Sequence, residues 1–392
     1  MLDITIESVL KLPVMDGCKL LAGQSGLTNV IHSVTVYDNL PTATDTEIMT
    51  FDGDIYITSL FFGKEDPHFI IDFICSLYRL HASAIFVIDE FICEIPQEAV
   101  DFCNAHGLPV ILIDRKTPYS LIISGIMEYK LMVQQRKSIE NNLKALTSHS
   151  ISQTEKETLI YDLNPNFQSH VLAVYCSPPI DFAVSTSTPY NTSYVSIINR
   201  ISKYPTYFAS EYRRGLLIVL SKKSSLSSEF ENSIESIIAF IHTNIPQCKI
   251  GISDIHSSSD LGKCISQAYM AASADSSEPG KISRYCELGI EKLLIASEGN
   301  PMLEEFYQEV ITPITVYDQK HHTELLHTLF VFVKNNMDYA RTCADMFLHE
   351  NTVRYRIGKI KELIPYGKND MDFIVTLSVV YKIHKLLPDN YS

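Results

Sequence analysis

The sequence predicts a multidomain chain in which two domains of mixed helices and strands precede an all-helical domain. Its 392 residues exceed what one hydrophobic core usually organises, so two or three domains are expected. Short β-branched runs alternate with helical periodicity up to about residue 297, whereas residues 301–388 show helical patterns only. We therefore expect domains at 1–123, 165–297 and 298–392, with a linker at 124–164.

The N-terminal domain, residues 1–123, is expected to be α/β with a largely parallel sheet. Brief apolar runs without alternation indicate strands that are buried on both faces, as in parallel sheets. Apolar spacing near 3.6 residues predicts helices at 69–81 and 97–106 between these strands. The strand-like runs are 34–37, 55–58, 84–88 and 110–113.

The linker is predicted to be one long polar helix at 122–147, followed by a Ser/Thr/His-rich hinge at 147–154. Its apolar residues fall near a seven-residue repeat, which Arg136 interrupts. They are Met132, Val133, Ile139, Leu143 and Leu146. The repeat is too short to separate two readings, a linker helix lying on a neighbouring domain and a short dimerising coiled coil.

The central domain, residues 165–297, is predicted to follow the order β-α-β-β-α-β and then to add a helix at 258–274. This order is typical of a ferredoxin-like or nucleotide-cyclase-like α+β sheet. Arg213-Arg214-Gly215 forms the expected turn between two adjacent strands. The predicted strands are 171–176, 207–212, 216–220 and 249–252, and the predicted helices between them are 194–204 and 228–242.

A helix-turn-helix is predicted near residues 338–363 of the C-terminal domain. Asp338 is a good N-cap for a short helix, in which the small residues Cys343 and Ala344 would allow close approach of another helix. A third helix follows, and its apolar residues have the i, i+4, i+7 spacing of a buried stripe. They are Val353, Ile357 and Ile360.

The opposite face of this third helix has the composition of a DNA recognition helix. It carries four basic residues and no acidic one between Asn351 and Lys361, in a chain whose net charge is −14. DNA meets only the face presented to it, so the acidic total does not exclude binding. A basic amphipathic helix can also be a merely solvated face. The candidate DNA-contacting residues are Thr342, His349, Asn351, Thr352, Arg354, Tyr355, Arg356 and Lys359.

These candidates are expected to divide the work of recognition. Asn351 and Thr352 lie in the first turn, where short polar side chains reach base edges or phosphate. Arg354 is assigned to base reading. Arg356 and Lys359 are expected to extend toward the phosphate backbone.

Composition favours a cytoplasmic protein without a membrane segment. Apolar residues make up 46% of the chain, but no run approaches the eighteen or more residues that span a bilayer. The first residues lack the basic flank and apolar block of a secretory signal. Nine cysteines without any Cys-x-x-Cys pair indicate buried free thiols in a reducing compartment.

The sequence resembles the PucR/CdaR family of bacterial transcription regulators over most of its length. The likeness is strongest at Phe347–Ile357, which resembles the family's C-terminal helix-turn-helix signature. Further segments resemble its lead-in helix, its N-terminal domain and its degenerate GGDEF-like central domain. These are 317–321 with 323–329, then 4–10, 21–23, 26–27 and 34–36, and finally 251–253 with 268–269.

The resemblance implies a regulator, an activator in our interpretation, of a catabolic operon that responds to a purine, an amino acid or a sugar acid. It implies an N-terminal sensor domain, with the effector site placed at the carboxyl edge of the parallel sheet by the rule for open α/β sheets. Two departures stand out. Glu350 replaces the family's usual basic or neutral residue. Residues 211–215 lack the paired glycines and carboxylates of an active cyclase, so no cyclase activity is expected.

Enzymatic and metal-binding readings are weak, and neither a cofactor nor a metal is expected. The phosphate-binding, zinc-protease and serine-hydrolase motifs are missing. Asp52-Gly53-Asp54 reads better as a polar turn than as a metal site. His321 and His322 with Glu324 form a poor chelate because adjacent residues point to different helix faces. The alternative function is a metabolite-binding signalling protein whose DNA binding is secondary or lost.

The expected partners follow from the regulator reading. They are double-stranded DNA at a promoter or operator, a small-molecule effector, and a second copy of the chain in a homodimer or higher homo-oligomer. RNA polymerase is a further candidate. One helix-turn-helix contacts only about half a site, which is the reason for expecting two heads.

Overall fold

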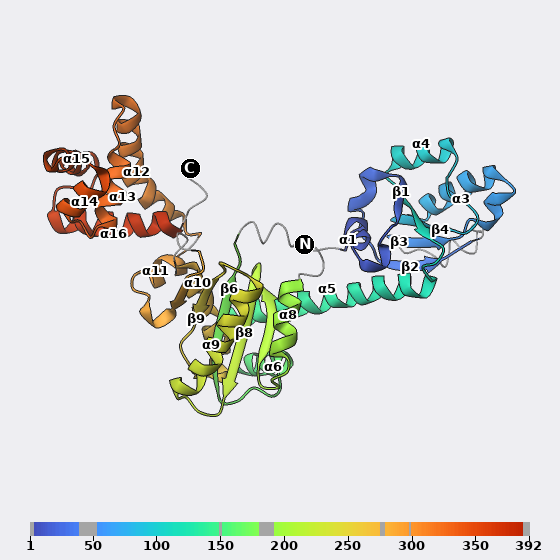
Figure 1. Cartoon of the computed structure of the whole chain (residues 1–392), viewed down its shortest axis with the longest axis horizontal. Helices are drawn as coiled ribbons and strands as arrows, with labels where there is room; N and C mark the ends of the chain where they lie inside the picture. Colours follow the sequence, from blue (N-terminus) through green and yellow to red (C-terminus); the bar gives the residue numbers. More distant parts are fainter. Residues whose placement is uncertain are drawn as a thin grey trace. The chain divides into compact units, whose positions relative to one another are not determined.

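The computed structural model of the chain describes residues 4–38, 53–148, 151–179, 192–274, 279–297 and 299–386 (Figure 1). These residues form two compact units, one built from the chain up to Asn141 and one from Asn142 to the C-terminal helices. The chain is thus mixed α/β with a helical C-terminal region, as predicted. Among the described residues, no helix has the length and apolarity needed to cross a bilayer.

The first unit is built on a five-stranded sheet with the order β1-β5-β4-β3-β2. The four predicted strands pair in parallel, which confirms the largely parallel sheet. They are β2 (Ser33–Val36), β3 (Asp54–Thr58), β4 (Ala84–Asp89) and β5 (Val110–Asp114). The sequence pattern missed β1 (Lys19–Ala22), which adds antiparallel to β5 at the sheet edge and is exposed at its start.

Helices cover both faces of this sheet, which explains the continuous apolar strands (Figure 1). One face packs against α1 (Ile6–Leu10) and the first turns of α5 (Tyr119–Thr147). The other face packs against α3 (Pro67–Arg79) and α4 (Gln97–His106). The helix predicted at 69–81 begins two residues earlier because Asp66 caps it and Pro67 occupies its first turn.

A second sheet, with the order β11-β9-β6-β8-β7, organises the first part of the second unit. The predicted order β-α-β-β-α-β is present along the chain. Strand β6 pairs antiparallel with both β8 and β9, and β7 pairs antiparallel with β8. The strands are β6 (His170–Ser177), β7 (Phe208–Tyr212), β8 (Gly215–Lys222), β9 (Lys249–Ile252), β10 (His256–Ser257) and β11 (Ile282–Arg284). The helices are α6 (Gln153–Leu163), α8 (Thr192–Ile201), α9 (Ser227–Asn244) and α10 (Leu261–Ser273).

Glycine permits the tight contact between α10 and β9. A Cβ on Gly251 would lie 2.0 Å from the Ala268 carbonyl oxygen, so a larger residue would force the helix off the strand. This packing brings together the two segments, 251–253 and 268–269, on which the resemblance of the central domain rests. The predicted hinge falls partly outside the described residues, and α6 begins within it at Gln153 under a Ser152–Glu155 capping box.

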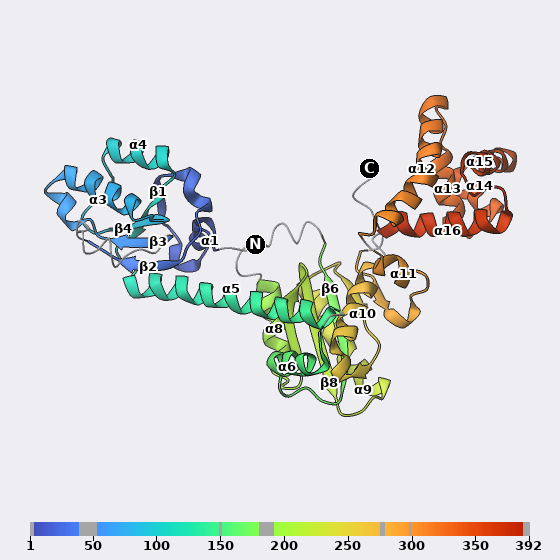
Figure 2. The same ribbon diagram turned by 180° about the vertical axis from the view of Figure 1, so that it is seen from behind.

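The described residues from 299 onward are helical throughout, as predicted. Figure 2 shows these helices gathered into one bundle. Its elements are α12 (Pro301–His321), α13 (Leu325–Lys334), α14 (Tyr339–Met346), α15 (Glu350–Leu363) and α16 (Asp370–Leu386). The short helix α11 (Glu291–Ala296) contributes Leu294 to the bundle's core.

The cysteines are free, but they are not all buried. Cys103, Cys176, Cys248 and Cys264 lie in the interior, whereas Cys93 and Cys286 are exposed. Burial raises the pKa of both Cys103 and Cys264 to about 12, so these thiols remain protonated at neutral pH. Their surroundings are those of core residues.

Candidate nucleic-acid interface

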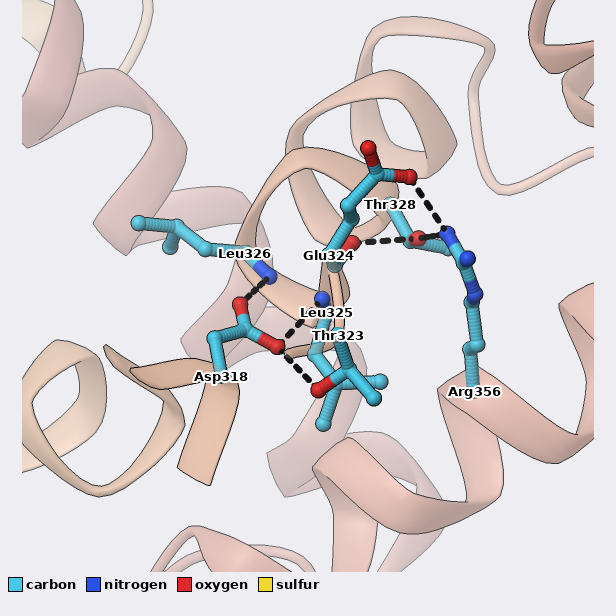
Figure 3. Close-up of polar contacts among 7 residues, drawn as sticks. All are labelled: Asp318, Thr323, Glu324, Leu325, Leu326, Thr328 and Arg356. Carbon is cyan, nitrogen blue, oxygen red and sulfur yellow. Dashed lines mark hydrogen bonds and ion pairs between the residues drawn. The ribbon is translucent and has the colours of Figure 1, made fainter. Parts of the chain in front are cut away.

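The helix-turn-helix is anchored to the preceding helix through Asp318. This residue lies near the end of α12, and its carboxylate accepts hydrogen bonds from the amides of Leu325 (2.8 Å) and Leu326 (2.9 Å) (Figure 3). The Thr323 hydroxyl donates a third at 2.6 Å. An acidic residue at the positive end of a helix satisfies amides that otherwise lack partners. Asp318 therefore fixes where α13 begins.

Helix α14 starts where the sequence predicted. The Asp338 side chain accepts from the Arg341 amide at 3.0 Å and caps the helix. Thr342 is fully buried, and its hydroxyl donates to the Asp338 carbonyl at 2.6 Å. Its assignment to DNA contact is therefore corrected, because its side chain cannot reach a ligand. Cys343 packs against the core as expected, whereas Ala344 is exposed.

The turn between α14 and α15 is short and tightly bonded. Phe347 ends α14 in the left-handed conformation, with φ +55° and ψ +38°. The Leu348 amide then donates to the Cys343 carbonyl at 3.1 Å. His349 caps α15, and its Nδ1 accepts from the Asn351 amide at 3.2 Å. Because Nδ1 accepts, the ring proton lies on Nε2, which remains a donor for an external group.

The buried stripe of α15 is confirmed. Val353 and Ile360 are fully buried and Ile357 is 4% exposed. All three belong to the core cluster shared with α12, α13 and α16. The stripe fixes which face of α15 points outward.

The N-terminal half of α15 presents an exposed polar face. His349, Asn351 and Thr352 are exposed, and Tyr355 is 67% exposed. The Arg354 side chain is 57% exposed, and its guanidinium pairs with Glu350 at 2.6 Å. The guanidinium also lies 4.4 Å from the centroid of the Tyr339 ring. Ring and carboxylate together orient this arginine at the surface.

Arg356 does not extend outward as predicted. Its side chain is only 18% exposed, and the guanidinium donates to the Thr328 hydroxyl at 3.0 Å and to Glu324 at 3.4 Å (Figure 3). Thr328 is itself buried and donates to the Glu324 carbonyl at 2.7 Å. Arg356 therefore ties α15 to the start of α13. Sequence spacing could not reveal this, because the partners lie about 30 residues away.

The two lysines near the end of α15 are also paired within the domain. Lys359 lies 2.8 Å from Glu362 and above the Tyr317 ring. The hydrogen bond that Lys359 donates to the Glu362 carboxylate raises the pKa of Lys359. Lys361 pairs with Asp370 at the start of α16. Every basic side chain of α15 thus has an acidic neighbour in this structure.

The other predicted sites receive less support. At the carboxyl edge of the parallel sheet, Asp38 accepts from the Thr58 hydroxyl (2.9 Å) and from the Ser59 amide (2.7 Å), and these protein donors satisfy one of its oxygens. A pocket of about 480 Å³ lies instead between α8 and α9, beside Arg200 and Phe240. Asp52 lies outside the described residues. No group of three potential metal ligands occurs within the described part of the chain.

A capped three-helix unit whose last helix has a buried stripe and an exposed polar face is the arrangement found in helix-turn-helix DNA-binding domains. Two family models match this chain. Residues 325–383 match the PucR C-terminal helix-turn-helix domain, and residues 8–129 match the purine catabolism regulatory protein-like family. These two segments of the chain are therefore similar to the N-terminal and C-terminal regions of PucR-type regulators.

Two curated relatives carry the names of regulators. The proline-responsive transcriptional activator PutR of Bacillus subtilis is 27% identical over 187 residues, which are 45% of this chain and 44% of PutR. The purine catabolism regulatory protein of the same organism is 27% identical over 85 residues, which are 22% of this chain and 16% of the relative. The matches thus span less than half the length of either relative.

Among solved structures, the chain is similar to the regulator of polyketide synthase expression from Bifidobacterium adolescentis. It shares 16% identity and covers 65% of this chain and 100% of its own, with a TM-score of 0.29. Likeness at this level supports no conclusion about the present chain.

Proposed function

We propose that this chain is a transcription regulator that binds duplex DNA through α14 and α15. The observation that carries the proposal is the two-sided character of α15. Its apolar stripe is buried while Asn351, Thr352 and Arg354 are exposed along its N-terminal half. The match of residues 325–383 to a helix-turn-helix family supports the same reading.

The exposed side chains suggest distinct roles. Asn351, Thr352 and Arg354 would read base edges, because amide, hydroxyl and guanidinium groups form the direct contacts of the major groove. His349 would donate from Nε2 to a phosphate, and Lys359 would neutralise another. Tyr355 would contact the groove edge. Arg356 is left out of the proposed interface because it is engaged with Glu324 and Thr328.

The remaining regions are proposed to sense a signal and transmit it. We keep the domain limits 1–123, 165–297 and 298–392 with a linker at 124–164. The first domain would bind a small metabolite such as a purine, an amino acid or a sugar acid, and the chain would activate a catabolic operon. The names of the relatives, which refer to proline and to purine catabolism, support this class of signal.

The central domain is proposed to be a ferredoxin-like, catalytically inactive relative of nucleotide cyclases. Its strand order and antiparallel pairing support this proposal. The hairpin at Arg213 and Arg214 offers no carboxylate pair for metal-assisted chemistry. We further propose that the protein works in the cytoplasm as a homodimer or higher homo-oligomer and that RNA polymerase is a partner on DNA.

Fluorescence anisotropy on DNA from upstream of the protein's own gene tests the central proposal. Arg354→Ala should weaken binding to the specific duplex by about 1–3 kcal/mol and relax the base preference at one position of the site. Lys359→Ala should weaken specific and scrambled duplexes alike and lower the salt slope by about one unit. Lys320→Ala, an exposed change on α12, is the matched control and should have no effect.

Parental affinity in both variants would show that α15 is not the reader. The alternative, a metabolite-binding signalling protein with secondary or lost DNA binding, would then be the better account. Adding proline, purines and sugar acids to the same titrations separates the two, because only a regulator should change its DNA affinity.

A further inference from the structure

Phe347 stands out because the structure leaves its side chain almost entirely in solvent. It is 95% exposed, whereas Met346 and Leu348 on either side are partly buried. Leu348 packs against the core of the helical domain. The turn between α14 and α15 therefore directs a large apolar side chain outward, beside the polar side chain of His349.

The fold does not account for an aromatic residue at this position. Phe347 occupies the left-handed region, which glycine or asparagine adopts at lower cost at the end of a helix. An exposed ring also contributes no hydrophobic free energy to folding. The turn is closed by backbone hydrogen bonds from Phe347 and Leu348 to α14, which any residue other than proline could supply. A strained, solvent-exposed residue of this kind points to a role in binding.

The position of Phe347 indicates what it would meet. It lies two residues before His349, the cap of α15, and so directly precedes the helix end that presents Asn351 and Thr352. A recognition helix inserts this end into the major groove. The groove displays mostly hydrogen-bonding groups, and the C5 methyl of thymine is its apolar group. A phenyl ring can make no hydrogen bond, so the methyl is what it can read.

We propose that Phe347 is a specificity-determining DNA contact whose ring packs on the methyl group of one thymine at the edge of the site. This inference rests on the proposed function. It adds an apolar contact to a face that was otherwise polar and charged. It also explains why this turn holds phenylalanine where asparagine would fold more easily.

Opposite effects on folding and on binding test the proposal. Phe347→Asn should raise the melting temperature of the full-length protein, since asparagine tolerates the left-handed conformation. The same variant should bind the specific duplex roughly tenfold more weakly. Met371→Asn, at an apolar residue of α16 that is 65% exposed, is the matched control and should bind like the parent.

Replacing each thymine of the site in turn by deoxyuridine, which lacks the methyl, identifies the contact. At one position the parent should lose affinity while Phe347→Asn loses none. Equal losses in both proteins at every position would overturn the thymine contact. Parental affinity in the variant would overturn any DNA role for Phe347. If Phe347→Asn halves the mass of the DNA-free protein in solution, the ring contacts a second copy of the chain instead of DNA.

The experiment separates this inference from the function on which it rests. If the parent fails to discriminate the specific duplex from the scrambled one, the proposed function fails. If the parent discriminates, Arg354→Ala loses affinity as expected and Phe347→Asn binds like the parent, only the present inference fails.

Discussion

At the residue scale, the charge that α15 offers to DNA is smaller than its sequence suggests. The segment 351–361 contains no acidic residue, yet Arg354 and Lys359 pair with Glu350 and Glu362 just outside it. Exposed pairs of this kind add little to stability. Their larger effect falls on binding, because a phosphate must compete with the carboxylate that already holds each cation. Glu350 is the clearest case, since it lies in the first turn.

Glu350→Gln should therefore tighten binding to DNA. The change removes a negative charge that would face the phosphates of bound DNA and frees Arg354, while the amide still occupies the first turn. We expect affinity for scrambled duplex to rise several-fold at low salt and the gain to shrink as salt increases. Anisotropy across a salt series measures both effects, and Glu305→Gln on α12 provides a control at a similar exposed position. An unchanged affinity would contradict this competition.

His384 makes the helical domain sensitive to acid. It lies on α16 with Nδ1 2.8 Å from the Tyr307 hydroxyl, and its ring stacks on Phe330 with centroids 4.2 Å apart. Burial lowers the pKa of His384 below its usual value of about 6.5. The unfolded chain therefore binds the proton more readily. The stabilisation is complete above about pH 6.5 and is lost as the pH falls through that value toward the folded pKa.

The melting temperature of the parent should accordingly fall further between pH 7.5 and pH 5.5 than that of His384→Gln. The glutamine keeps an acceptor near Tyr307 but does not titrate. His321→Gln, an exposed change at the end of α12, should follow the parent's pH dependence. The same pH dependence in the parent and in His384→Gln would assign the acid sensitivity to other groups.

At the scale of single elements, the spacing of apolar residues in the sequence predicted the strands and the helix face that are buried in the structure. The strands β3, β4 and β5 are buried on both faces, and their uninterrupted apolar runs were legible in the sequence. The stripe of Val353, Ile357 and Ile360 was equally clear. Strand β1 was not, because its first residues are exposed. Contacts between residues that are distant in the sequence were not predicted either, since no local pattern indicates that Arg356 pairs with Glu324.

The Asp318 cap offers a test at this scale. Asp318→Ala removes three hydrogen bonds from the start of α13 and should destabilise the helical domain by about 2 kcal/mol. Hydrogen exchange of the Leu325 and Leu326 amides should become markedly faster. Gln319→Ala, at the neighbouring exposed position, should leave exchange unchanged. Protected amides in Asp318→Ala would mean that another group fixes the start of α13.

At the scale of the whole molecule, we expect at least two copies of the chain to act together. A single helix-turn-helix contacts about half a site, and two heads one helical turn apart gain affinity by acting jointly. Light scattering should therefore give at least twice the chain mass of 44.3 kDa at micromolar concentration. A monomer, both free and on specific DNA, would refute this. Arg354→Ala should assemble like the parent, because it changes only the DNA-facing surface.

The strand order of the second sheet has a consequence for synthesis. Strand β6 lies between β9 and β8, and both neighbours are made after it. During synthesis, β6 can pair with β8 once the chain has been made as far as Lys222. Its other edge stays unpaired until Ile252, the end of β9, has emerged from the ribosome. A bare apolar strand edge can pair with another nascent chain. Premature termination between these two points should thus yield aggregates rather than a smaller folded protein.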